Sequence, residues 1–203
     1  MGDLGGYKQH TIMKKIVIIN GHPNKESFNF AIAETYKKAA ASGAEVKEIV
    51  ITDLVFNPNL QQGYMKRTEL EPDLLESIEK IQWADHLVWV HPVWWGGLPA
   101  LTKAFIDRAF LPGIMFKYRE NSPWWDKLLT GKTAHIITTL DFPTFIYKLQ
   151  YAKPSVNQLR KSTLQFCGIK KVKVSYFGPI KNSTDEQRAK ILKEVEKLGN
   201  KLK

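Results

Sequence analysis

Cysteine is scarce in this sequence, because Cys167 is the one cysteine among 203 residues. An internal disulfide is therefore excluded, and an oxidising compartment offers the fold no added stability. The sequence also lacks an apolar run near the roughly 20 residues that a membrane-spanning helix needs, and it has no secretory signal pattern. With 43% hydrophobic and 25% charged residues, its composition is that of a globular protein rather than a collagen-like or disordered chain. We expect a cytoplasmic protein with no stable membrane insertion.

Acidic residues are missing from one long stretch of the chain. No Asp or Glu occurs from residue 142 to residue 184, while the whole chain carries 30 Lys and Arg against 20 Asp and Glu, a formal net charge of +10. The basic residues of the stretch are Lys148, Lys153, Arg160, Lys161, Lys170, Lys171, Lys173 and Lys181. Such a surface attracts phosphates or an anionic membrane, although a solvated basic face is the simpler interpretation. No motif interleaves aromatic and basic residues, so we expect no nucleic-acid partner.

Metal-ligand clusters and activated nucleophiles are missing too. His22 and His91 follow or end predicted strands without the third and fourth ligands that a zinc site requires, so we expect no metal. Cys167 lies in the apolar run 164–168, which favours packing over nucleophilic chemistry. Lys103 and Arg108 lie on a predicted helix and are interpreted as solvated side chains or partners of the helix dipole.

Short apolar runs alternate with helical patterns along the chain. The expected strands are 16–20, 46–51, 85–91, 132–139 and 170–177, and the expected helices are 27–41, 72–83, 99–110 and 184–202. Strands that are apolar throughout and separated by helices indicate a parallel sheet covered on both faces. The sequence therefore predicts an α/β protein with three layers and a five-stranded parallel sheet. We expect one domain over 13–203, with residues 1–12 as a leader outside the fold.

Polar residues follow the first predicted strand. There is no G-x-G-x-x-G motif here, which argues against a Rossmann-type dinucleotide site. Instead, the loop 21–29 leads into a helix N-terminus, where free backbone N–H groups and the helix dipole favour a phosphate. Ser27 suits both the capping of this helix and the binding of such a phosphate.

Two tryptophans and two glycines follow the third predicted strand, at Trp94, Trp95, Gly96 and Gly97. Ligands of open parallel sheets lie beyond the carboxyl ends of the strands. Aromatic side chains there suggest a stacking wall for a flat ring, and glycines let the backbone approach that ring. Packing of the loop against its own helix is the alternative. Hydroxyl groups follow the fourth strand at the same edge, in the run 138–141.

Taken together, these motifs carry a resemblance. They are His22-x-x-x-x-Ser27-Phe28-Asn29, Trp83-Ala84-Asp85, Pro92-x-x-Trp95-x-Gly97-x-Pro99-Ala100, Lys103-x-x-x-Asp107-Arg108-x-Phe110, Thr138-Thr139 and Phe166-Cys167-Gly168. In this joint order the chain resembles the NAD(P)H:quinone oxidoreductase family of flavodoxin-like flavoproteins over residues 14–202. That group also includes bacterial general-stress proteins and the ancillary oxidoreductases of potassium efflux systems.

The resemblance implies a flavin site built from all of these loops. The implied contacts to the flavin phosphate arm are His22, Ser27, Phe28 and Asn29; those to the isoalloxazine are Pro92, Val93, Trp94, Trp95, Gly96, Thr138, Thr139 and Leu140. Asp107 and Arg188 match an acid and an arginine that contact adenosine in FAD-binding relatives. The same pair also occurs in relatives that use FMN, so the resemblance does not decide whether the flavin is FAD or FMN.

The resemblance also implies an activity and an assembly. It implies that the flavin takes a hydride from NAD(P)H and passes two electrons to a quinone or similar flat acceptor by a ping-pong mechanism. It further implies a homodimer in which Trp95, Phe116 and Tyr118 contact substrate, the latter two across the interface. The apolar segment 110–118 is expected to be exposed in a monomer, which favours a partner. The alternative is a flavin-bearing regulatory subunit of a membrane transporter.

Two departures from the family pattern affect the expected chemistry. Leu140 and Asp141 stand where the family has two glycines. Tyr147 or Tyr151 would be the catalytic tyrosine of the family, but no histidine lies beyond His135 to accompany it. Lys153 or backbone N–H groups would then replace that histidine.

Overall fold

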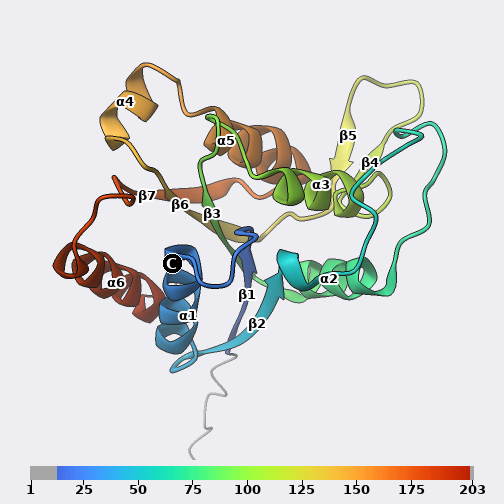
Figure 1. The fold of residues 1–203 in the computed structure, drawn as a ribbon. Helices are drawn as coiled ribbons and strands as arrows, with labels where there is room; N and C mark the ends of the chain where they lie inside the picture. The colour runs from blue at the N-terminus through green and yellow to red at the C-terminus, as the bar shows by residue number, and fades with distance from the viewer. Residues whose placement is uncertain (1–12, 202–203) are drawn as a thin grey trace, which may run out of the picture.

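A parallel sheet forms the centre of the protein (Figure 1). The computed structural model describes residues 13–201, so the expected leader at 1–12 lies outside the described residues. The strand order is β2-β1-β3-β6-β7, and every neighbouring pair is parallel. The strands are β1 (Lys14–Asn20), β2 (Ala44–Val50), β3 (His86–Pro92), β6 (Thr133–Thr139) and β7 (Lys171–Phe177). The predicted five-stranded parallel sheet is confirmed.

Helices cover both faces of this sheet and complete three layers. Two helices, α1 (Phe28–Ala40) and α6 (Asp185–Asn200), pack on one face. The other face is covered by α2 (Pro72–Trp83), α3 (Ala100–Ala109) and the continuous segment of α5 (Pro154–Asn157) and η2 (Gln158–Gln165). A short turn, η1 (Ile51–Asp53), follows β2. No helix among residues 13–201 is long and apolar enough to cross a membrane.

The central strand β3 shows why the apolar runs become buried strands. All seven of its residues are buried, and alternate side chains enter opposite cores because the period of a strand is two residues. Leu87 and Trp89 pack with α2 and α3, whereas Val88 and Val90 pack with α1 and α6. If every second residue of β3 were polar, those polar side chains would be buried in one of the two apolar cores.

Several short elements were not predicted. They are α4 (Thr144–Leu149), α5, η2, and a hairpin of β4 (Phe116–Tyr118) and β5 (Trp125–Lys127). Three-residue strands carry too little periodicity to be read from sequence. The hairpin also corrects the expected exposure of 110–118. Met115 and Phe116 are buried in the chain's own core, with the Phe116 ring 4.8 Å from that of Phe166, whereas Tyr118 stays exposed.

Arg108 holds the long loop between η1 and α2. The side chain is fully buried rather than solvated, which corrects the expectation from sequence. Its guanidinium donates to Glu71 Oε2 at 2.8 Å and to the Glu69 carbonyl at 2.8 Å. A buried cation is tolerated only when it is paired and hydrogen-bonded in this way. Lys103 also departs from a simple solvated side chain, because its Nζ pairs with Asp107 at 2.7 Å.

We predict that the protein loses stability as the pH falls below about 6.5. Burial lowers the pKa of His86 to about 3 and that of His91 to about 4, while the unfolded chain binds the proton near the ordinary value of about 6.5. Each histidine therefore destabilises the fold by about 1.4 kcal/mol per pH unit below that value, until its folded pKa is reached.

Urea unfolding at pH 7.5, 6.5 and 5.5 measures this effect. The variant His86→Gln removes one of the two titrations, so its unfolding free energy should fall less steeply between pH 6.5 and 5.5 than that of the wild type. Parallel profiles for the two proteins would contradict the assignment.

Candidate functional site

The loops after β1, β3 and β6 meet at one edge of the sheet. Parallel pairing sets Asn20 beside Val90 and Pro92 beside Thr139, so β3 and β6 end level with each other and β1 ends two residues earlier. A hollow of about 300 Å³ lies over these ends. Its lining residues are His22, Glu26, Ser27, Phe28, Asn29, Pro92, Val93, Trp94, Thr139, Leu140, Asp141, Ile180 and Arg188. Most of the flavin contacts implied by the resemblance are thus brought together.

Ser27 occupies the N-cap position of α1 but does not cap the helix with its side chain. Its backbone is extended, as a cap residue requires, and its hydroxyl makes no bond to the helix N–H groups. The Oγ atom is buried and has no hydrogen-bond partner among the described residues. The first N–H groups of a helix also lack partners within the helix. The expected side-chain cap is therefore not formed, and a phosphate at this position would satisfy both kinds of group.

Polar groups from α1 and β6 join behind the hollow. Asn29 is buried and its Nδ2 donates to Thr139 Oγ1 at 2.9 Å, which ties α1 to the end of β6. The neighbouring Thr138 is fully buried below the lining, and its Oγ1 has no partner among the described residues. His91 on β3 lies opposite Thr138 in the sheet. The Nε2 atom of His91 is likewise buried and has no hydrogen-bond partner among the described residues. Unpaired buried polar atoms are rare, and here they gather at one strand edge.

Arg188 supplies positive charge to the hollow. Its Nε donates to Ser183 Oγ at 2.9 Å, and its guanidinium carbon lies 5.6 Å from the centre of the Phe28 ring. These two contacts hold the side chain at the side of the hollow that Phe28 lines. Of the lining acids, Asp141 is engaged, because its Oδ1 accepts from the Lys181 backbone N–H at 3.0 Å.

His22 lines the hollow as a neutral side chain. Partial burial lowers its pKa from the ordinary value, against the smaller opposing effect of the Asn24 carbonyl. Its backbone N–H donates to Asn20 Oδ1 at 3.1 Å, and its ring meets that of Trp94 edge-on at 5.6 Å. Its ring Nδ1 accepts from the Asn24 backbone N–H at 3.0 Å, so His22 shapes the site but adds no full charge at neutral pH.

Trp94, which lines the hollow, begins a tight turn that ends at Gly97. Trp94 and Gly97 exchange two backbone hydrogen bonds of 3.1 and 2.8 Å, and the intervening Trp95 and Gly96 have φ of 49° and 74°. Positive φ is unusual for a bulky residue and costs energy. The Trp95 side chain is fully exposed, so the strained backbone presents a flat aromatic surface to solvent.

Tyr147, one of the two tyrosines expected to be catalytic, supports this turn from behind. The side chain is fully buried, and its hydroxyl lies 2.5 Å from Ser155 Oγ. Ser155 in turn donates its backbone N–H to the Gly96 carbonyl at 3.1 Å. Tyr151, the other tyrosine expected to be catalytic, is exposed. Neither tyrosine lines the hollow. Ser155 was not found from sequence, because only the fold brings it to Gly96.

Asp107 lies away from the hollow. It lines a separate cleft of about 330 Å³ beside Phe116, Tyr118 and Cys167. Arg188 lies in the first hollow, so one chain does not bring together the acid and the arginine that the resemblance pairs on adenosine. Burial raises the pKa of the Cys167 thiol to about 12, which agrees with its expected packing role.

Known proteins resemble this chain along most of its length. A Haemophilus influenzae protein described as an NAD(P)H oxidoreductase is 29% identical over 178 residues, covering 85% of this chain and 87% of the relative. An FMN-dependent NADH:quinone oxidoreductase of Pseudomonas fluorescens Pf-5 is 30% identical over 141 residues, covering 62% of this chain and 70% of the relative.

Solved structures agree on the fold. The Streptococcus mutans protein Smu.1420 superposes with a TM-score of 0.78 at 29% identity, covering 92% of this chain and 98% of that protein. The family model described as the flavodoxin-like fold matches residues 14–202. With a parallel sheet of order β2-β1-β3-β6-β7 and a ligand hollow at its carboxyl edge, the chain belongs to this flavodoxin-like family.

Proposed function

We propose that the protein is a flavin-dependent NAD(P)H oxidoreductase that transfers two electrons, as hydride, to quinones or similar flat acceptors. The observation that carries this proposal is the buried, unpaired Ser27 hydroxyl, at a helix N-terminus in a hollow bounded by the Trp94–Gly97 turn. An anion site next to an aromatic turn fits a cofactor with a phosphate arm and a flat ring. The names of the Haemophilus and Pseudomonas relatives support the same donor and acceptor classes.

The described residues divide the binding of such a cofactor between them. Ser27, the α1 N-terminus and Arg188 would hold the phosphate arm by hydrogen bonds and charge. Trp94 and Leu140, from the β3 and β6 loops, would line the ring. A bound flavin supplies hydride acceptance and donation, while the protein supplies position and electrostatics. The absorption spectrum of the purified protein and the mass of the released cofactor decide between FMN and FAD.

Backbone groups would do the work of the missing family histidine. The N–H groups of Trp95 and Gly96 donate to no acceptor among the described residues, so they are available to stabilise negative charge on a ring beside the turn. Lys153 lines a different hollow and does not line this one. We expect the donor and then the acceptor to occupy the same exposed stacking surface in turn. The donor must therefore leave before the acceptor binds, which is a ping-pong order.

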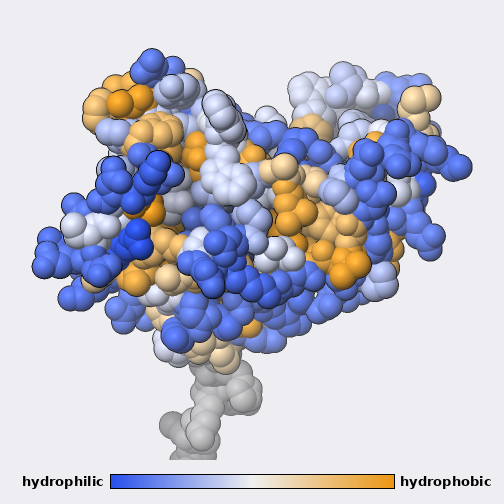
Figure 2. All heavy atoms as spheres, viewed as in Figure 1, coloured by the Kyte–Doolittle hydropathy of each residue, from blue (hydrophilic) through white to orange (hydrophobic). Residues whose placement is uncertain are grey.

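We propose that the active form is a homodimer in the cytoplasm, where NAD(P)H is supplied. Tyr118 and Trp124 are exposed on the β4–β5 hairpin, which extends from one end of the molecule (Figure 1). Figure 2 shows a second apolar area over α4, where Phe145 and Leu149 are exposed. Exposed aromatic residues of this size favour a partner surface. Phe116 is buried in its own chain, so Tyr118 is the residue that we expect to reach the neighbouring site.

We predict that Ser27→Ala weakens flavin affinity about tenfold to a hundredfold and leaves folding intact. The hydroxyl makes no bond in the protein alone, so its loss costs only a hydrogen bond to the phosphate, about 1.5–3 kcal/mol. Fluorescence titration of the apoprotein measures affinity, and urea unfolding of the apoprotein measures stability. Ser77→Ala, a serine on α2 outside the hollow, is the matched control and should bind flavin as the wild type does. Unchanged affinity in Ser27→Ala would remove the phosphate assignment.

We predict different effects for the two glycines of the turn. Gly96 has φ of 74°, so Gly96→Ala should destabilise the fold by about 1 kcal/mol. A Cβ on Gly97 would meet only the Trp94 carbonyl oxygen, at an ordinary 3.6 Å. Gly97→Val should therefore crowd the ring rather than the protein, lowering flavin affinity at an unchanged urea midpoint. If Gly97→Val binds flavin normally, the turn is not in contact with the ring.

We predict that Tyr118 acts across a dimer interface. Homodimers of Tyr118→Ala and of Gly97→Val should each be impaired in quinone reduction. A mixed dimer pairs one intact flavin site with the Tyr118 of the other subunit and should regain part of the activity. Differently tagged subunits that are co-expressed and purified through both tags provide the mixed dimer. No recovery in such a dimer, or a monomer in sedimentation at micromolar concentration, would rule out this arrangement.

A further inference from the structure

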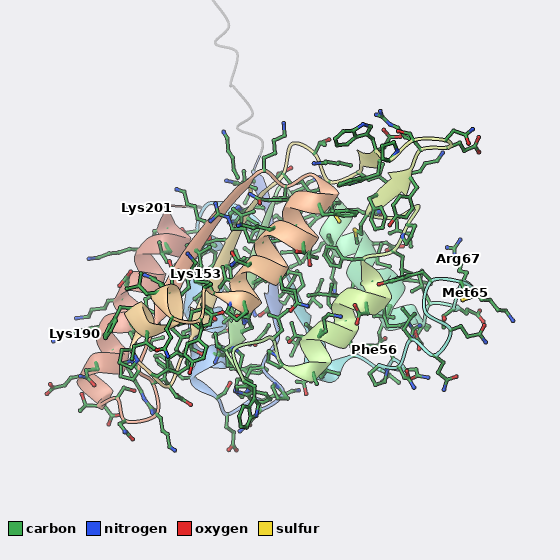
Figure 3. The ribbon with its side chains drawn as sticks, turned by 90° about the horizontal axis from the view of Figure 1, so that it is seen from above. Phe56, Met65, Arg67, Lys153, Lys190 and Lys201 are labelled. Carbon is green, nitrogen blue, oxygen red and sulfur yellow. The ribbon has the colours of Figure 1, made fainter. Side chains whose placement is uncertain are left out.

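A second hollow, of about 430 Å³, lies over the edge strand β7 and the α5–η2 segment. Its lining residues are Lys153, Val156, Asn157, Arg160, Lys161, Val174 and Tyr176. Three cations therefore border one concave surface. In Figure 3, Lys153 lies on the α6 side of the molecule, away from Phe56 and Arg67.

The positive charge of this basic hollow is not neutralised by the described part of the chain. None of Lys153, Arg160 and Lys161 forms an ion pair with a described acid. Arg160 Nε is buried and has no hydrogen-bond partner among the described residues. The walls come entirely from the acid-free stretch 142–184. Uncompensated guanidinium and ammonium groups in a recess favour an anion with several oxygen atoms, such as a phosphate.

The remaining walls of the basic hollow suit a nucleoside. Val156 and Val174 provide apolar surface, and Tyr176 provides an aromatic ring. Lys148 Nζ lies 4.5 Å from the centre of that ring, which brings a fourth cation to the rim. A concave site with apolar walls and a few placed charges is typical of small-molecule binding, whereas a flat membrane surface has no need of a recess.

The basic hollow is joined to the proposed flavin site through the start of α5. Ser155 donates to the Gly96 carbonyl, and a Cβ on Gly96 would meet Pro154 Cγ at 3.4 Å, so α5 begins directly behind the Trp94–Gly97 turn. Lys153, the N-cap of α5, is held with a positive φ of 57°. Arg160 follows seven residues later, about 10 Å along the helix axis. A dinucleotide with its nicotinamide at the turn would bring its adenosine end to the basic hollow.

We propose that the basic hollow binds the 2′-phosphate of NADPH, with Arg160 and Lys161 selecting this donor over NADH. This inference rests on the proposed function and names the donor of the same reaction. Charge-assisted hydrogen bonds to a phosphate group that NADH lacks supply the discrimination.

The double variant Arg160→Gln, Lys161→Gln tests the assignment. The ratio of kcat/KM for NADPH to that for NADH should fall about tenfold or more, which corresponds to the loss of about one charge-assisted hydrogen bond. The matched control is Lys190→Gln, Lys193→Gln on α6, two exposed lysines outside both hollows, and it should keep the wild-type ratio. Lys161→Gln alone, at an exposed position, provides the same test with a smaller effect if the double variant does not fold.

Calorimetry provides a readout that does not depend on turnover. Wild-type holoprotein should bind adenosine 2′,5′-bisphosphate at least tenfold more tightly than 5′-AMP, and the double variant should lose this difference. If the wild type oxidises neither nucleotide, the proposed function fails, and the calorimetric comparison still decides the 2′-phosphate site.

Three outcomes would overturn the inference. The first is an unchanged NADPH/NADH ratio in the folded double variant, and the second is equal wild-type affinity for the bisphosphate and for 5′-AMP. The third is co-sedimentation of the wild type, but not of the double variant, with phosphatidylserine vesicles while bisphosphate binding is the same in both. That result would assign the basic hollow to a membrane surface instead.

Discussion

The in-register parallel pairing of β1, β3 and β6 is the constraint on which the rest of the structure depends. Because β3 pairs with β1 on one side and with β6 on the other, all three strands end within two residues of one another in the sheet register. Each following loop then opens at the same edge. Thr102 of α3 fixes the first loop, since its Oγ1 donates to the Gly21 carbonyl at 2.8 Å. A Cβ on Gly21 would collide with Thr102 Oγ1, so a glycine is required for this close approach.

The proposed site separates groups that touch ligand from groups that hold them. The strained Trp95–Gly96 backbone faces outward, and the Tyr147–Ser155 pair secures it from within. Strain of this kind persists only where surrounding contacts fix the backbone. The same α5 segment that supports the turn continues into the wall of the basic hollow. One structural connection therefore joins the proposed sites for the reacting ring and for the donor's distal phosphate.

Charge is distributed unevenly between these two sites. The hollow over the strand ends carries Arg188 together with Glu26 and Asp141, and burial lowers the pKa of His22, which keeps it neutral at pH 7. The basic hollow has cations and no acids. A cofactor that stays bound gains affinity from a helix N-terminus and well-placed polar partners. A donor that binds and leaves in every cycle gains association rate from long-range electrostatic attraction. The acid-free stretch supplies that attraction on the side where α5 begins.

The sequence alone determined the repeating order of strands and helices and the loops that carry the site. Local signals were sufficient there: α2 begins and ends where its proline and apolar spacing predict, and the Trp94–Gly97 turn follows the third strand as expected. Only the tertiary structure decided that Ser27 leaves its helix uncapped, that Tyr147 is buried below the turn, and that Phe116 packs inward. The burial of Tyr147 and Phe116 depends on partners far away in the chain, such as Gly96 and Phe166, because the packing of a side chain is decided by the segments that the fold brings together.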